Sequence, residues 1–191
     1  MTEQLKEIKK KLKKELDKNR YQHTLGVMYT ASCLAMRYGN DMNQAMLAGL
    51  LHDCAKCIPD EKKIQICKKN HITMRNIEED NPFLLHAKLG AFIAQKEYGI
   101  KDTEILHAIE VHTTGAPNMS LLDKIVFVAD YIEPNRDKAP NLDEIRTLAF
   151  ENIDAGVLRN LDDTLHFQNK KRGSIDEKTH ETYEYYKDLL K

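Results

Sequence analysis

The stretch from Leu121 to Ile132 is apolar on almost every side of the helix that its residue spacing predicts. Such a helix is stable when other elements surround it, so we expect it to lie in the middle of the domain. Ser120 is placed to cap its start, and Glu133-Pro134-Asn135 is expected to end it. Because β-branched alternation is nearly absent and glycine and proline are scarce, the chain is expected to be all-α.

Apolar residues at spacings of three and four predict further helices on both sides of this stretch. Single helices are predicted over Thr2 to Lys18, Arg20 to Arg37, Gln44 to Leu51, Glu61 to Lys69, Phe83 to Tyr98 and Thr103 to His112. Two or three further helices are predicted over Asn141 to Arg159 and Thr179 to Leu189. The core stripe of the second helix is expected to comprise Leu25, Met28, Tyr29, Ser32 and Met36. Asn19 is the expected break before that helix, and Gly39 and Asp102 are expected caps. We expect residues 70–82 to be irregular and Phe167 to Asp176 to be a polar link.

The 191 residues are enough for one domain with a solid core, so we expect a single domain, with a motif core at about 20–136 and helices of 141–191 packed on it. The 29 Lys and Arg residues nearly balance the 30 Asp and Glu residues, and no global basic field indicates a nucleic-acid polymer as partner. Apolar runs are too short for a membrane span or a signal-peptide core, so no membrane partner is expected and the predicted location is cytoplasmic.

Four cysteines, Cys33, Cys54, Cys57 and Cys67, are expected to be reduced thiols. Cys54-Ala55-Lys56-Cys57 has a CxxC spacing, but no second pair accompanies it, so a zinc site there is the weaker interpretation.

The segment from Leu50 to Lys56 places an imidazole, a carboxylate and an ammonium group at the end of a buried helix. Adjacent helical residues point about 100° apart, so His52 and Asp53 can both curve around one ion beside the helix. His23, His86 and His112 also stand at helix ends or on the side of an amphipathic helix, from where they can point into a shared cleft.

Asp130 lies near the end of the apolar helix, so we expect its carboxylate to be buried and paired. One interpretation is a salt bridge to Arg136 or Arg37, and the other is a metal ion. The order His23, His52-Asp53, His86, His112, Asp130 resembles the HD superfamily of metal-dependent phosphohydrolases.

Longer matching segments narrow the resemblance to the YqeK-like symmetrical bis(5'-nucleosyl)-tetraphosphatases. These segments are Arg20 to Val27, Ala48 to Lys56, His86 to Gly90, His112 to Gly115 and Asp123 to Arg136, with a looser match at Arg172-Gly173-Ser174 and Thr179 to Tyr186. The resemblance implies an HD-domain helical bundle that hydrolyses diadenosine tetraphosphate, and related dinucleoside polyphosphates, symmetrically to two ADP through a metal-activated water. It also implies a homodimer.

The resemblance assigns a role to each residue of the motif. It implies that His23, His52, Asp53 and Asp130 hold the catalytic ion, and that His86 and His112 bind a second ion or contact phosphate. Mixed imidazole and carboxylate ligands suit iron, manganese or zinc better than magnesium. Iron, as one or two ions, is what the family suggests.

Further catalytic and nucleotide-binding residues surround these ligands. We expect Asp53, Lys56, His86 and His112 to be catalytic. Nucleotide or phosphate contacts are expected from His23, Asp53, Cys54, Ala55, Lys56, His86, His112, Thr113, Tyr131, Arg136, Lys171, Arg172, Gly173 and Ser174. Other interpretations are a solvated lysine for Lys56, an ordinary turn for Thr113, core packing for Tyr131, a surface ion pair for Arg136, and a solvated charge run for Lys171 and Arg172.

The remaining histidines, His71, His107, His166 and His180, match no ligand of the family. Three functions compete with the expected one: an HD phosphohydrolase acting on another nucleotide or phosphate ester, a non-catalytic nucleotide sensor, and a purely structural helical domain.

Overall fold

The computed structural model describes residues 1–170 and 176–191, and all regular elements within those residues are helices. They are α1 (Glu3–Glu15), α2 (Lys18–Tyr38), α3 (Met42–Leu51), α4 (Asp60–Lys69), α5 (Asn76–Asp80), the short 3-10 helix η1 (Pro82–Leu84), α6 (Leu85–Glu97), α7 (Thr103–Val111), α8 (Leu121–Ile132), α9 (Leu142–Glu151), α10 (Ile153–Lys170) and α11 (Glu177–Leu189). The expected all-α class is confirmed.

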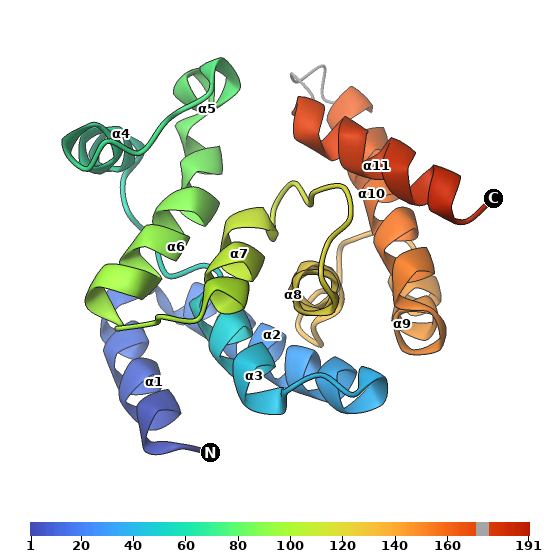
Figure 1. The fold of residues 1–191 in the computed structure, drawn as a ribbon, viewed down its shortest axis with the longest axis horizontal. Coiled ribbons are helices and arrows are strands. Elements are labelled where there is room, and N and C mark those ends of the chain that lie inside the picture. The colour runs from blue at the N-terminus through green and yellow to red at the C-terminus, as the bar shows by residue number, and fades with distance from the viewer. Residues whose placement is uncertain (171–175) are drawn as a thin grey trace.

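The central element is α8, the helix with the apolar surface. Figure 1 shows it nearly end-on between α7 and the group of α9, α10 and α11, with α2 and α3 beneath it. Ser120 and Asp123 form a reciprocal capping box at its start, since each side chain accepts the other residue's backbone N–H. Ile125, Val126 and Val128 are fully buried, as the apolar pattern predicts.

Helices α2 and α3 pack closely against each other. A Cβ atom added to Gly49 would lie 3.1 Å from the Cα atom of Met28 and 3.3 Å from the Cβ atom of Ala31, so a side chain at Gly49 would push the two helices apart. The face of α2 that meets α3 and α8 is therefore made largely of small and medium residues. The buried residues of α2 are His23, Thr24, Val27, Met28, Ala31, Leu34 and Ala35.

The predicted core stripe of α2 is wrong at Tyr29 and Met36, whereas Met28 is fully buried as predicted. Tyr29 and Met36 are 49% and 61% exposed, whereas Ser32 and Leu25 are half-buried, and Leu25 packs against the core. Tyr29 and Met36 lie on the outer side of α2, whereas Met28, Ala31 and Ala35 lie on the side that packs into the core.

Helix boundaries follow the expected caps with one exception. Gly39 adopts φ 73° after α2, and the Asp102 carboxylate accepts backbone N–H groups at the start of α7, as expected. The predicted break at Asn19 is wrong, because Asp17 caps α2 by accepting the N–H of Arg20, and Asn19 lies within the first turn.

Two segments are more helical than expected. Residues 70–82, predicted to be irregular, contain α5 and the start of η1. The predicted polar link from Phe167 is helical as far as Lys170, where α10 ends.

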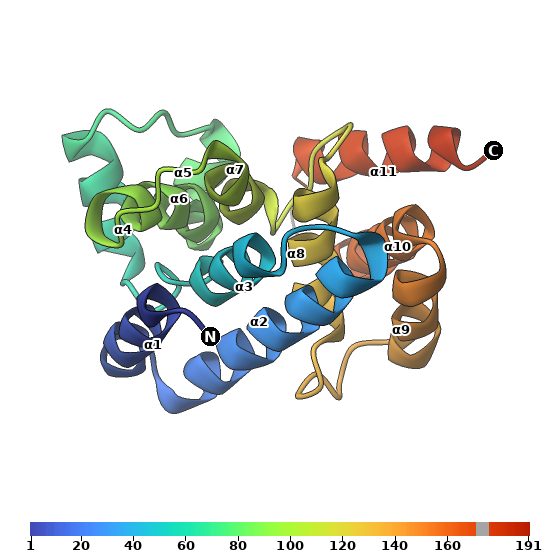
Figure 2. The ribbon, with the colours of Figure 1, turned by 60° about the horizontal axis from the view of Figure 1, so that its bottom comes forward.

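Figures 1 and 2 show α4, α5 and α6 on one side of α8 and α9, α10 and α11 on the other. Arg75, just before α5, donates hydrogen bonds of 2.6 and 2.7 Å to the carboxylate of Asp176, the N-cap of α11, and so connects the two sides. Within the described residues, no helix has both the length and the hydropathy needed to cross a membrane.

Candidate metal centre and phosphate site

The predicted ligands come together from separate helices. They are His23 on α2, His52 and Asp53 directly after α3, His86 in the first turn of α6, His112 directly after α7, and Asp130 in the last turn of α8. Small residues in α2 and α3 allow these helix ends to approach one another, and the four histidines and Asp53 are all less than 10% exposed.

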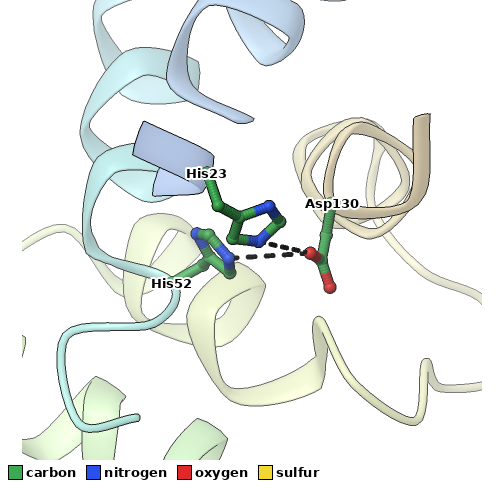
Figure 3. Close-up of side chains that lie close together, drawn as sticks. All are labelled: His23, His52 and Asp130. Atoms are coloured by element: carbon green, nitrogen blue, oxygen red, sulfur yellow. Dashed lines mark ion pairs between the residues drawn. The ribbon is translucent and has the colours of Figure 1, made fainter. Parts of the chain in front are cut away.

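A first ligand group consists of His23, His52, Asp53 and Asp130. The Nε2 atoms of His23 and His52 lie 2.9 and 3.8 Å from Oδ1 of Asp130, as Figure 3 shows. Oδ2 of Asp53 lies 3.3 Å from the His52 Nε2 atom and 3.8 Å from that of His23.

A second ligand group lies on the other oxygen of the same carboxylate. Oδ1 of Asp53 is 3.4 Å from Nε2 of His86 and 3.7 Å from Nε2 of His112, and the two Nε2 atoms are 3.2 Å apart. Asp53 therefore belongs to both groups, with one oxygen directed towards each.

Each of the four histidines has its outer nitrogen, Nδ1, next to an oxygen acceptor. Nδ1 of His23 lies 3.1 Å from Oε1 of Glu133. The acceptors for the other three are the backbone carbonyl oxygens of residues 49, 83 and 109, at 2.7, 2.5 and 2.7 Å for His52, His86 and His112. These contacts place the proton on Nδ1 and direct the lone pair of Nε2 inwards.

Three of the inward atoms have no hydrogen-bond partner in the described part of the chain. Within the described residues, Nε2 of His23, Nε2 of His52 and Oδ1 of Asp53 are buried without a hydrogen bond. Lone pairs and carboxylate oxygens that face one another repel unless a cation lies between them. The donor set of imidazole nitrogens and carboxylate oxygens therefore fits a divalent metal ion.

Electrostatics keep both carboxylates ionised. Burial by itself raises the pKa of Asp53, but charge and hydrogen-bond interactions with His52, His112 and His86 hold that pKa well below its usual range. Burial also opposes ionisation of Asp130, where His23, His52 and Arg136 keep the pKa well below its usual range.

The pKa of His86 is also far below that of an ordinary histidine. Burial is the main cause, and the nearby charges of Lys56 and His112 add to it. A neutral His86 keeps its lone pair available as a ligand.

Three cationic side chains surround the carboxylates. Arg136 donates a 2.9 Å bond to Oδ1 of Asp130, one of the two partners expected for that residue. Nζ of Lys56 lies 3.0 Å from Nε2 of His86. Arg20, which sequence reasoning did not assign to the site, donates a 2.6 Å bond to Oδ2 of Asp53; its position one helical turn before His23 is the signal that could have found it.

Other pairings expected from the sequence are not formed. Arg37 bonds the backbone carbonyl of Phe150 instead of Asp130. The Asp130 side chain is 23% exposed, so it is less buried than expected. Among the described residues, the groups arranged to hold a metal contain no cysteine.

A cavity of about 220 Å³ lies beside the two ligand groups; we call it the central cavity. The predicted phosphate residues Lys56, Thr113, Tyr131 and Arg136 line it, together with Arg20, Asp53, His86, His112, Phe127, Asp130, Asn160 and Thr164. Oγ1 of Thr113 lies 3.1 Å from Nε2 of both His86 and His112. Asn160 and Thr164 were missed because the predicted helical range ended at Arg159 and was expected to pack on the outside of the domain, whereas α10 continues to Lys170.

Some predicted nucleotide contacts lie elsewhere. Cys54 and Ala55 are buried away from the central cavity, and the Cys54 thiol donates to the carbonyl of Gly90. Tyr131 does line the central cavity, but its hydroxyl donates to Asp163. The predicted contacts at Lys171, Arg172, Gly173 and Ser174 lie outside the described residues.

Known proteins resemble this chain over most of its length. The HD domain family matches residues 20–135. Symmetrical bis(5'-nucleosyl)-tetraphosphatases from Bacillus subtilis (strain 168) and Halalkalibacterium halodurans are 41% and 42% identical to it, and the matches cover 91% and 90% of this chain and 92% and 91% of the relatives.

A solved structure resembles the whole fold. It is the crystal structure of a protein described as a predicted HD superfamily hydrolase involved in NAD metabolism, from Clostridium acetobutylicum, with a TM-score of 0.93 at 42% identity over 96% of this chain and 97% of that chain. The chain therefore belongs to the HD-domain family and, within it, to the symmetrical bis(5'-nucleosyl)-tetraphosphatases.

Proposed function

We propose that this chain hydrolyses diadenosine tetraphosphate symmetrically to two ADP, with a divalent metal ion held by the first ligand group. The observation that carries the proposal is the set of buried, inward-facing ligand atoms without hydrogen bonds, beside a cavity lined by Arg20, Lys56 and Arg136. The activity named for the relatives from B. subtilis and H. halodurans supplies the substrate.

We further propose that His86 and His112 bind a second ion rather than phosphate. Their Nδ1 protons are already donated to backbone carbonyls, so their Nε2 atoms have no proton to donate to a phosphate oxygen. Imidazole and carboxylate ligands suit iron, manganese and zinc, and iron is the ion that the family resemblance favours. The homodimer and the cytoplasmic location stay predictions.

The metal ligands and the cationic residues of the site have different roles in hydrolysis. A divalent ion in such a site lowers the pKa of bound water and polarises a phosphoryl oxygen. Arg20, Lys56 and Arg136 stabilise the negative charge of the phosphates as it increases towards the transition state. Water adds across the central P–O–P bridge: one phosphorus gains the oxygen of water, the other keeps the bridging oxygen, and both products are ADP.

The test is anaerobic incubation of the metal-reconstituted protein with diadenosine tetraphosphate, followed by ion-exchange separation of the products. We expect ADP as the sole product and loss of at least about 99% of the activity in Asp53→Asn, because that carboxylate belongs to both ligand groups. Asp80→Asn, which makes the same change at an exposed position in α5, should retain full activity.

Other products would contradict the proposal in different ways. ATP plus AMP would refute symmetrical cleavage. Tight binding of metal and dinucleotide without turnover would instead favour a sensor, and hydrolysis of only other phosphate esters would replace the substrate.

A further inference from the structure

A larger cavity of about 650 Å³, which we call the outer cavity, lies against the first turns of α2 and the loop after α8. Asn19 and Gln22 line it from α2, and Lys138 lines it from the loop. All three side chains are exposed, and none forms a hydrogen bond or an ion pair with another described residue. Two amides and an ammonium group are therefore available to a ligand.

The outer cavity and the central cavity both border the first ligand group. Arg20 and Arg136 line both cavities. His23 of the first ligand group lines the outer cavity, whereas Asp53 and Asp130 line the central one. The two cavities thus extend from the same ligand group and share two guanidinium groups.

The carboxylates at the outer cavity are mostly engaged by the protein itself. Oε2 of Glu133 accepts hydrogen bonds from the backbone and side chain of Asn135, and Oε1 lies against His23. Asp17 caps α2 by accepting the N–H of Arg20. Arg20 and Arg136 are paired with Asp53 and Asp130. Lys138, whose chain neighbour Asp137 also lines the cavity, has no hydrogen bond or ion pair to another described residue and can attract an anion.

Symmetrical cleavage requires a site that holds both halves of the substrate at once. The central bridge of the substrate must lie at the ligand groups, and an ADP half must extend from each side of that bridge. The central cavity, at about 220 Å³, is the smaller of the two. We propose that the outer cavity receives the second nucleoside diphosphate half, with Lys138 at its phosphates and Asn19 and Gln22 hydrogen-bonding its nucleoside. This inference rests on the proposed function.

Calorimetric titration of the metal-loaded protein with ADP tests the inference without turnover. We expect two ADP molecules to bind per wild-type chain. Asn19→Ala combined with Gln22→Ala, and separately Lys138→Ala, should weaken one of the two sites by about tenfold or more and leave the other within about twofold. Gln65→Ala and Lys18→Ala remove the same kinds of side chain outside both cavities and should leave both sites unchanged.

Binding of a single ADP to the wild-type chain, or two sites that are unaffected in the outer-cavity variants, would overturn the inference. These results are separable from failure of the proposed function. If the wild-type chain produces ADP from the dinucleotide but binds one ADP, only the inference is wrong. If it binds two ADP molecules but produces no ADP from the dinucleotide, the proposed function is wrong.

Discussion

At the scale of single residues, Glu133 orients the metal ligand His23. Its carboxylate is 1% exposed and lies 3.1 Å from Nδ1 of His23. Gly26 makes room for it, because a Cβ atom at that position would overlap Oε2 of Glu133. A carboxylate on the outer nitrogen fixes the orientation of a ligating imidazole and makes its other nitrogen more basic.

Glu133→Gln should therefore weaken metal binding by about 10- to 100-fold while the fold is retained. The affinity is measured by competition with a chelator, and a thermal melt monitors the fold. Glu104→Gln, at an exposed position of α7 without a side-chain contact, is the control. An unchanged affinity in Glu133→Gln would mean that this carboxylate has no part in holding His23.

The ligands themselves could be predicted from sequence, because their order and residue types resemble a known motif. The role of Glu133 could not be predicted, because the sequence Glu133-Pro134-Asn135 indicates only where a helix ends. Its partner lies 110 positions earlier, and no local pattern reveals that the chain returns to that point.

At the scale of helices, Gly115 sets how closely α11 packs on the turn between α7 and α8. It has φ 67°, and a Cβ atom there would lie 2.7 Å from Cγ2 of Thr182 on α11. Gly39, with φ 73°, has the same type of backbone conformation but no atom within 4 Å of such a Cβ.

Gly115→Ala should lower the free energy of unfolding by about 2–4 kcal/mol, and Gly39→Ala by about 1 kcal/mol. The positive φ costs both variants stability, and only the first also displaces α11. Urea denaturation measures both values. Equal losses would show that α11 yields to the added methyl group.

Caps were more predictable than helix faces. Ser120, Asp102 and Gly39 act through backbone groups a few residues away, so a local pattern is enough to identify them. The buried face of α2 depends on Gly49 of another helix, and apolar spacing alone also selected Tyr29 and Met36, which are exposed.

At the scale of the whole molecule, the pair formed by Arg75 and Asp176 connects the α4–α6 side with α11. The Asp176 side chain is 3% exposed, and Arg75 also contacts Glu78. The sequence did not predict this ion pair, because its two residues are 101 positions apart.

Asp176→Asn should lower the free energy of unfolding by about 1.5–3 kcal/mol, since asparagine can still cap α11 but cannot pair with the guanidinium group. Asp188→Asn is the comparison, because Asp188 is 66% exposed in its pair with Lys191, and its replacement should leave the free energy of unfolding nearly unchanged. Chemical denaturation of both variants distinguishes a structural connection from an ordinary surface pair.

The position of α8 has a consequence for the nascent chain. Its Asp130 completes a ligand group whose other members lie on α2 and just after α3, near the beginning of the chain. While the ribosome is still translating the codons between them, the emerging polypeptide cannot assemble that group, however well its first helices have formed. Acquisition of the ion is thus a late event in biogenesis, and hydrolytic competence reports that long-range packing is complete.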